Sequence, residues 1–349
     1  MGLTTGIQPT WSIAADQVDI TATIAARFIS LTLTDAMGFE SDMLEITLSD
    51  NDPSAPIAIP PTGAELLLSL GYDGANAPMG MFVCDEVELA GWPGEMVIRA
   101  RAATYDKSKG GKSDLQTQKT RSWPKETRLG DMVAKIAKEH GMEPAVSASL
   151  KAIPLPHTDQ ADESDINLLV RLAKKYDAVV KPSGGKLVMA KRGESKSVGG
   201  EALAPVVLVP TDCTAFRMVM AKRETAGMVV SYWHAVKEAK RNEVKVGKGE
   251  PVRRLKQYYP NEEMALAAAR AELSKRQRGE QTVALTVTGS PMIAAECPLT
   301  LAGFRPGVDG EWLINRVTHR LDASGGYVCD LEGEKPNQDE QPQVEIESK

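Results

Sequence analysis

The segment Gly111-Lys112-Ser113 matches the end of a phosphate-binding loop, a motif whose backbone amides and lysine hold a nucleotide phosphate. That motif also needs a glycine five residues before its second glycine, and the corresponding position holds Asp106. A carboxylate there would repel a phosphate, and no apolar strand precedes the segment. The segment is therefore interpreted as a solvated loop, and no nucleotide site is predicted.

Four histidines are scattered along the chain: His140, His157, His234 and His319. Their spacing does not match a zinc motif such as HExxH. His140 is expected at a helix C-terminus, where the helix dipole alone explains it. His157, Asp159 and Ser164 contain the residue types of a hydrolase triad, but no G-x-S-x-G elbow accompanies them. A structural role is therefore favoured for all three.

Four cysteines stand singly in the sequence: Cys84, Cys213, Cys297 and Cys329. The absence of a Cys-x-x-Cys pair excludes a zinc ribbon and a thioredoxin-type motif. The four could form two disulfides, but a chain of this length can build a core without them. Free buried thiols are favoured, including Cys297 before Pro298.

Two carboxylate pairs, Asp162-Glu163 and Glu262-Glu263, are predicted at helix starts, where the helix dipole favours acidic residues. A basic cluster is interrupted by Glu238 and Glu243, so it is interpreted as a mobile solvated loop. The basic residues of this cluster are Lys237, Lys240, Arg241, Lys245 and Lys248. No catalytic, cofactor-binding or metal-binding residue is predicted, and the chain is not expected to be an enzyme.

The 349-residue chain is long enough for two or three domains of roughly 100–200 residues each. Hydrophobic residues make up 42% and charged residues 25%, as in ordinary globular proteins. The 47 acidic residues exceed the 41 basic ones, and aromatic residues make up only 5%. Because phosphate binding needs basic surface and base stacking needs aromatic rings, specific nucleic-acid binding is disfavoured.

No segment is expected to enter a membrane. The longest strongly apolar stretch, residues 202–209, is too short to span a bilayer and contains Pro205. The first ten residues lack the basic and apolar regions of a secretion signal. A soluble chain is therefore expected.

Residues 1–105 are predicted to form a first β-barrel-like domain, because apolar and polar residues alternate with the period of a strand. Turn-forming residues separate the segments, which favours an antiparallel barrel or sandwich. The predicted strands are residues 18–24, 28–34, 44–49, 65–72, 81–89 and 96–103. Residues 106–126 are polar and are predicted to be a linker.

Residues 127–192 are predicted to form a small α+β domain of two helices and a hairpin. Apolar residues recur at helical spacing from Leu129 to Ala137, and Gly141 supplies the stop. A second helix is expected over residues 164–176, with Ser164 as its N-cap. The turn at residues 182–185 then separates two short strands. Residues 193–204 are rich in Gly, Ser and Lys and read as a linker.

Residues 205–332 are predicted to form a second β-barrel-like domain that contains one helix, residues 262–276, capped by Asn261. Its predicted strands are residues 216–220, 228–234, 283–287, 299–301, 311–321 and 327–331. Residues 333–349 are charged with little to bury, so a disordered tail is expected. The fold class is therefore mainly β with an α+β insertion.

Two segments carry a family resemblance. One runs from His157-Thr158-Asp159-Gln160 through residues 163–173 and Tyr176 to residues 185–188, and the other from residues 308–314 through 317–319 to 325–327. Both resemble the late control protein D family of phages, the central baseplate hub of contractile tails. Relatives of this family occur in pyocins and in the N-terminal hub part of type VI secretion spike proteins. The resemblance extends from about Trp11 to Glu334.

This resemblance implies a structural protein without catalysis. Each chain would supply two barrel-like domains, so that a homotrimer forms a pseudo-six-fold ring and adapts the six-fold tail tube to the three-fold spike. The implied partners are the tail spike protein, the tail tube or tube-initiator protein, baseplate wedge proteins and a tape-measure protein. The chain would assemble in the cytoplasm of the bacterial host and then belong to the baseplate of a virion or pyocin tail. Because the chain ends soon after the second β region, a separate hub subunit is expected and not a fused hub-spike.

Two alternatives remain open at this stage. A tail-associated peptidoglycan hydrolase would need a catalytic Glu with a partner carboxylate, a Cys/His pair or a metal set in a cleft. A wall-binding module is the second alternative, because the helix-hairpin content of residues 127–192 is similar to small wall-binding folds. Both a DNA-carrying phage and a DNA-less pyocin are compatible with the sequence.

Overall fold

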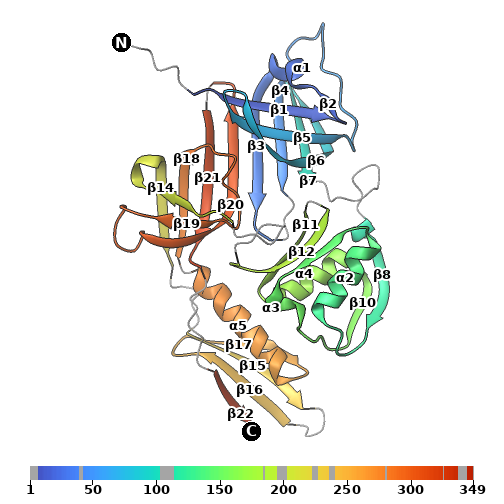
Figure 1. Ribbon diagram of the computed structural model, residues 1–349, viewed down its shortest axis with the longest axis vertical. Coiled ribbons are helices and arrows are strands. Elements are labelled where there is room, and N and C mark those ends of the chain that lie inside the picture. Colours follow the sequence, from blue (N-terminus) through green and yellow to red (C-terminus); the bar gives the residue numbers. More distant parts are fainter. Residues whose placement is uncertain are drawn as a thin grey trace.

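The computed structural model describes residues 7–38, 42–102, 114–183, 185–194, 203–221, 227–235, 240–279, 281–324, 326–336 and 344–348. These residues form a large antiparallel sheet at one end of the molecule and a helix-on-sheet unit at the other end. An α+β unit lies beside them (Figure 1). Among the described residues, no helix has the length and apolar character needed to cross a membrane.

Thirteen strands form the large sheet. They are β1 (Pro9–Ala15), β2 (Val18–Asp19), β3 (Phe28–Ala36), β4 (Met43–Ser49), β5 (Glu65–Tyr72), β6 (Ala75–Ala90), β7 (Glu95–Ala102), β13 (Val206–Leu208), β14 (Cys213–Met220), β18 (Gln281–Thr288), β19 (Pro298–Leu301), β20 (Gly310–Asp322) and β21 (Gly326–Glu334). The order is β14-β18-β21-β20-β3-β4-β7-β6-β5-β1-β2, and every neighbouring pair on this path is antiparallel. The prediction of a mainly antiparallel β protein is confirmed.

A ladder between β20 and β3 joins the two β regions into one sheet. Its register runs from Arg316 opposite Ala36 to Asp322 opposite Ser30. The alternation of apolar and polar residues predicts these strands. It does not identify which strands pair, because every strand has the same period of two. Side chains from both regions consequently share one core, which includes Leu31, Leu44, Leu68, Trp312, Val317 and Leu331.

The predicted strand at residues 18–24 is wrong in its second half. The chain forms β2 and then the short helix α1 (Thr21–Ala25). The carboxylate of Asp19 accepts a hydrogen bond from the Thr21 N–H at 2.8 Å, and the Thr21 hydroxyl accepts one from the Ile13 N–H at 2.9 Å. These side chains form hydrogen bonds with backbone groups and turn the chain, in competition with the hydrogen bonds of a strand. The alternation of apolar residues does not reveal this competition.

The α+β unit contains three helices and two small sheets. Its elements are η1 (Asp114–Gln116), β8 (Gln118–Trp123), α2 (Leu129–Glu139), β9 (Glu143–Val146), α3 (Ala148–Lys151), β10 (Thr158–Ser164), α4 (Asp165–Lys175), β11 (Ala178–Ser183) and β12 (Lys186–Lys191). The predicted N-cap is confirmed, since the Ser164 hydroxyl accepts a hydrogen bond from the Asn167 N–H at 3.3 Å. The hairpin of β11 and β12 is also confirmed.

Three details of this unit differ from the sequence prediction. Strand β8 lies within the predicted linker 106–126 and pairs with β10. Helix α3 was not predicted. Asp162 and Glu163 lie in β10 and not in a first helical turn, because the helix begins only after Ser164. Strand β8 is almost entirely polar, so it has no apolar alternation by which to recognise it.

The helix-on-sheet unit consists of β15 (Met228–Ala235), β16 (Lys240–Gly247), β17 (Val252–Tyr259), β22 (Val344–Ser348) and α5 (Glu262–Gly279). The strand order is β17-β15-β16-β22, and α5 packs its small and apolar residues against this sheet. Asn261 caps α5 as predicted, since its side chain accepts a hydrogen bond from the Met264 N–H at 2.9 Å.

Two predictions fail in this unit. Residues 240–247 of the basic cluster form strand β16 where a mobile loop was expected, and residues 344–348 form strand β22 within the predicted disordered tail. In both segments β-branched residues alternate with charged ones, as in Val344-Glu345-Ile346. High charge favoured disorder in the prediction, but this alternation is sufficient to add a strand to an existing sheet edge.

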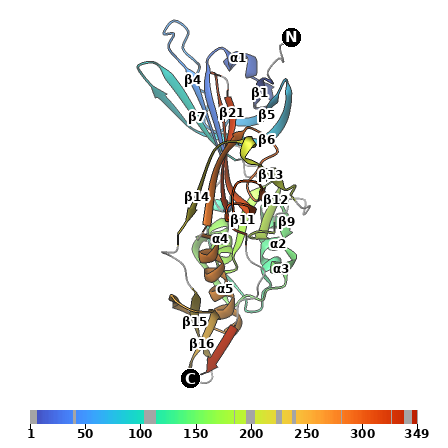
Figure 2. The same ribbon diagram turned by 90° about the vertical axis from the view of Figure 1, so that its left-hand side faces the viewer.

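Polar contacts fasten the α+β unit and α5 to the large sheet. The guanidinium of Arg278 in α5 binds Asp177 at 2.6 Å and lies 3.2 Å from Glu334 in β21. The ammonium of Lys181 in β11 lies 3.9 Å from Asp35 in β3. A small apolar cluster of Met37, Val179, Ala295 and Leu313 fills the junction between β3, β11 and β20. The turned view shows the large sheet at one end of the molecule and α5 with β15 and β16 at the other (Figure 2).

Candidate functional site

The densest polar cluster of the described residues surrounds Asp165, the first residue of α4. Its carboxylate has no exposed surface and accepts hydrogen bonds from Lys119 Nζ at 2.7 Å, Arg121 Nη2 at 2.7 Å, His140 Nε2 at 2.8 Å and Gln160 Nε2 at 2.8 Å. Burial alone would raise the pKa of Asp165, but these bonds outweigh burial and lower the pKa to about 2. The carboxylate is therefore ionised at neutral pH.

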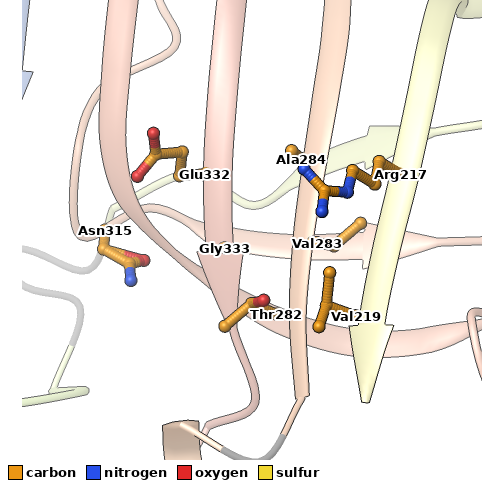
Figure 3. Close-up of a pocket in the computed structure, with 8 residues that line it drawn as sticks. All are labelled: Arg217, Val219, Thr282, Val283, Ala284, Asn315, Glu332 and Gly333. Carbon is orange, nitrogen blue, oxygen red and sulfur yellow. The ribbon is translucent and has the colours of Figure 1, made fainter. Parts of the chain in front are cut away.

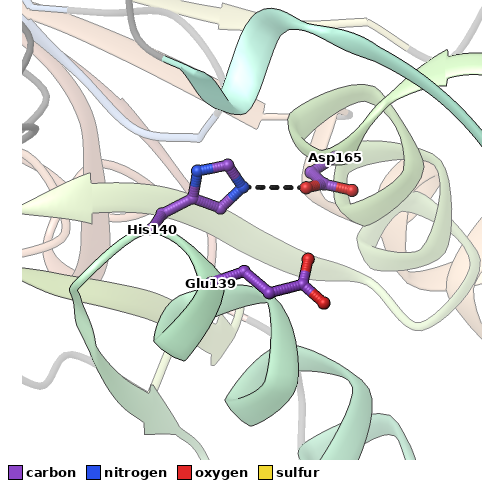
Figure 4. Close-up of side chains that lie close together, drawn as sticks. All are labelled: Glu139, His140 and Asp165. Carbon is purple, nitrogen blue, oxygen red and sulfur yellow. Dashed lines mark hydrogen bonds and ion pairs between the residues drawn. The ribbon is translucent and has the colours of Figure 1, made fainter.

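Glu139, His140 and Asp165 bring ligand atoms within 4.8 Å of one another, the spacing of a metal site (Figure 4). Two cations already hold these carboxylates, because Arg121 binds Glu139 at 2.7 Å and Lys119 binds Asp165 at 2.7 Å. A metal ion would lie next to both positive charges. The cluster is therefore interpreted as an ion-pair network that joins β8, α2, β10 and α4.

The interpretation of His140 from the helix dipole alone is wrong. His140 does lie at the end of α2, but its ring is buried and bonded to Asp165. The sequence does carry a weak signal for this network: Lys119 and Arg121 stand two residues apart in the polar strand β8, so both cations lie on the same face. Nothing in the sequence identifies Asp165 as that partner.

A second buried cluster lies where β20 meets β21. His319 Nδ1 lies 2.9 Å from the Tyr327 hydroxyl and 3.2 Å from Cys329 Sγ. A cysteine protease would need a thiolate beside an imidazolium. Here burial lowers the pKa of His319 to about 4 and raises the pKa of Cys329 to about 11, so both groups are neutral. The cluster is a buried hydrogen-bonded contact and not a nucleophilic pair.

The structure does not assemble the other residues examined for catalysis. His157 Nε2 lies 3.1 Å from Asp159 on an exposed strand, while Ser164 caps α4. Cys297 is buried, and burial raises the pKa of its thiol. His234 stacks on the Tyr258 ring with centroids 4.9 Å apart. Residues 111–113 lie outside the described residues.

Among the described residues, the long strands β14 and β6 of the large sheet each have an open edge, as do the short strands β2 and β13. Strand β14 ends the sheet and pairs only with β18. Strand β6 pairs with β5 over Ala75–Val83, so that its last residues, 86–90, pair only with β7. Both open stretches are exposed on both faces, unlike the inner strands. Exposed apolar residues on β14 include Phe216 at 52% and Met220 at 62% of their full accessibility.

A shallow pocket of about 260 Å³ lies on the sheet surface next to β14 (Figure 3). Arg217 and Val219 of β14 and Thr282 of β18 line one side, and Glu332 of β21 lies across from them. The pocket's position beside an open strand makes it a hollow that a side chain of a second protein could fill.

The sequence is similar to known tail proteins over most of its length. A family model described as phage tail baseplate hub (GPD) matches residues 99–325. A protein of Escherichia phage 186 named "probable baseplate hub protein" is 31% identical over 365 residues, which cover 92% of each chain. The chain belongs to the phage tail baseplate hub family. It is therefore a structural component of a phage-type tail baseplate.

Solved structures agree with this fold. The 43 kDa tail protein of prophage MuSo2 from Shewanella oneidensis has a TM-score of 0.70 at 16% identity, covering 94% of this chain and 98% of that one. A type VI secretion system component of Escherichia coli has a TM-score of 0.53 at 10% identity, covering 91% of this chain and 75% of that one. The family resemblance seen in the sequence is confirmed, and no comparison supports the hydrolase alternative.

Proposed function

We propose that this baseplate hub acts without catalysis as a homotrimeric ring that adapts a six-fold tail tube to a three-fold spike. The observation that carries the proposal is the pair of open edges on β14 and β6. Eight strands lie on the path from β14 to β6, and each is antiparallel to the next. Because eight is even, β14 and β6 run in opposite directions. A head-to-tail contact of β14 with β6 of the next copy would therefore add one more antiparallel pair.

Three copies joined in this way would close a ring in which the edges of β14 and β6 are both paired. The ladder between β20 and β3 divides the eight strands into two groups of four, β14-β18-β21-β20 and β3-β4-β7-β6. A trimer would contain six such groups, which supports a pseudo-six-fold ring. In this proposal residues 1–105 and the sheet strands of residues 205–332 are the two ring-forming domains, and residues 127–192 form a peripheral α+β domain.

The proposal includes the partners of such a ring. They are the tail spike protein, a tail tube or tube-initiator protein, baseplate wedge proteins and a tape-measure protein that passes through the lumen. Assembly would take place in the host cytoplasm, before the hub becomes part of the virion or pyocin baseplate. The apolar surface of β14 supports this order, because a surface of this kind is normally covered in the finished assembly.

Replacing Phe216 and Met220 together by glutamate is expected to reduce the trimer to a monomer, because the two charges would be buried against β6 of the next copy. The measurement is molecular mass by light scattering, with and without the cognate spike protein. Met292→Glu is the matched control, since Met292 is 76% exposed and belongs to neither edge strand but to the segment between β18 and β19. A wild-type chain that stays monomeric with the spike, or a double variant that still forms trimers, contradicts the proposal.

A further inference from the structure

One large aromatic side chain of this hub lies almost fully in solvent. Trp92 is 89% exposed, the highest value among the large hydrophobic side chains that are exposed in the described residues. It lies at the tip of the hairpin between β6 and β7, and Leu89 near the end of β6 is also exposed. Exposed tryptophan costs solvation free energy in a free protein, and tryptophan is enriched among the residues that dominate protein interfaces.

The tip that carries Trp92 is held by its neighbours. The Gly94 N–H donates a hydrogen bond to the Asn51 side chain, and the Gly94 carbonyl accepts one from the Asp50 N–H at 2.8 Å. The backbone packs so closely here that a Cβ atom on Gly94 would collide with the Asp50 carbonyl. The hairpin tip is therefore fixed to the loop that follows β4.

That loop is itself ordered by side-chain bonds. The Asp50 carboxylate accepts a hydrogen bond from the Ile57 N–H at 2.9 Å, and Arg27 donates one to the Ala55 carbonyl at 2.6 Å. Arg27 also lies 3.5 Å from the Asp50 carboxylate. Trp92 thus extends from a preorganised support, so that binding through it would order few additional groups.

The position of the tip excludes the open edges as its place of contact. Trp92 lies beyond the ends of β6 and β7, along the strand direction, whereas copies in a ring would meet at right angles to it. Figure 2 shows this hairpin, drawn in teal, projecting from the end of the molecule opposite α5 and β16. In a closed ring, this end would be a rim.

The two rims of such a ring would differ in symmetry. At the Trp92 end the strand ends of both four-strand groups are present, together with the short helix α1, so the strand ends of that rim would approximate six-fold symmetry. The opposite end carries the unit formed by α5 with β15–β17, once in each chain, and is therefore three-fold. The six-fold partner, the tail tube, fits the Trp92 rim.

Acidic residues dominate the surface around the tip. On the hairpin strands, the base of the tip and the adjoining loop, the acidic residues are Asp50, Asp52, Asp85, Glu86, Glu88 and Glu95, against the basic residues Arg27, Arg99 and Arg101. The Arg99 guanidinium binds Glu45, Glu86 and Glu88 at 2.9, 2.6 and 2.8 Å, so one cation is shared by three carboxylates. A partner complementary to this surface presents an apolar pocket with a basic margin.

We propose that Trp92 is the anchor by which the hub docks the tail-tube ring, its indole entering an apolar pocket with basic residues around it. This inference rests on the proposed ring. It assigns to this tip the tube side of the hub, and to the α5 end the spike side.

The test measures binding of the trimeric hub to the purified cognate tail-tube protein and, separately, to the cognate spike protein. Trp92→Ala is expected to weaken tube binding at least 30-fold, while trimer mass, spike binding and melting temperature stay unchanged. Trp92→Phe should recover part of the loss, and Met292→Ala, at another exposed apolar residue, should bind as wild type. Tube binding by the wild type should also weaken as salt concentration rises.

The outcomes separate this inference from the proposed function. A hub that stays monomeric with the spike contradicts the ring itself. A trimer whose wild type does not bind the tube, or whose Trp92→Ala variant binds the tube equally well, overturns the anchor alone. If Trp92→Ala weakens spike binding and leaves tube binding unchanged, the tip contacts the spike, and the inference is overturned. A drop in trimer mass would show that a neighbouring copy covers Trp92, which also overturns the inference.

Discussion

Replacing Asp165 by alanine is expected to lower the free energy of unfolding by about 3–5 kcal/mol, the usual result of removing one partner of a buried ion pair. The variant would leave Lys119 and Arg121 beside a buried space with no carboxylate to bind. His140 and Gln160 would lose hydrogen bonds of 2.8 Å in the same step. Urea denaturation of the full chain, followed by circular dichroism, measures the change.

Asp159→Ala is the matched control, because that carboxylate is on the same strand-helix segment but is mostly exposed. It should change stability by less than about 1 kcal/mol. An Asp165→Ala variant as stable as this control would mean that the network adds nothing to the fold. Removing the Asp165 carboxylate should also lower the protection of backbone amides in residues from β8 to α4 before it affects the rest of the chain. Hydrogen exchange measures this protection residue by residue.

The Asp165 carboxylate also makes the stability of the folded chain depend on pH. Because its pKa is lowered from 3.8 to about 2 in the folded chain, the unfolded state binds the proton more readily. The stability that Asp165 supplies is therefore complete above about pH 4 and is lost as the pH falls toward 2. Asp165→Asn should remove this part of the acid response.

Local structure was predictable wherever short-range chemistry determines it. The alternation of Leu44, Ile46 and Leu48 predicts β4, and these side chains are buried in the core. Ser164 and Asn261 predict the N-termini of α4 and α5, because each side chain bonds to an N–H group within three residues. Such patterns require no knowledge of the rest of the chain.

Long-range pairing was not predictable from these patterns. The ladder of β20 with β3 joins residues almost 300 positions apart, and any strand with the same alternation could occupy its place. Strand β8 was missed because its half-buried side chains, Lys119 and Arg121, are cations that find their partner Asp165 far along the chain. The sequence predicts a turn between the strands at residues 81–89 and 96–103, but the exposure of Trp92 in that turn depends on the three-dimensional surroundings.

The seam between the two β regions is expected to weaken in mild acid because of His319. This residue lies opposite Leu33 of β3 and Cys329 of β21, and its side chain is only 1% exposed. Burial lowers its pKa from 6.5 to about 4, so the folded chain binds this proton less readily than the unfolded chain. Stability therefore falls as the pH decreases from about 6.5 to 4, by up to about 3 kcal/mol from this group.

Replacing His319 by glutamine removes the titrating group, so the unfolding free energy should vary less with pH between 4 and 6.5. His157→Gln, at an exposed histidine, should leave the wild-type slope unchanged. Equal slopes for His319→Gln and wild type would show that burial of this imidazole does not control the acid response. Because the β20–β3 ladder joins the two halves of each chain, protonation here would loosen the contact that a ring of such chains depends on. Trimer mass measured across the same pH range therefore tests whether the seam also limits assembly.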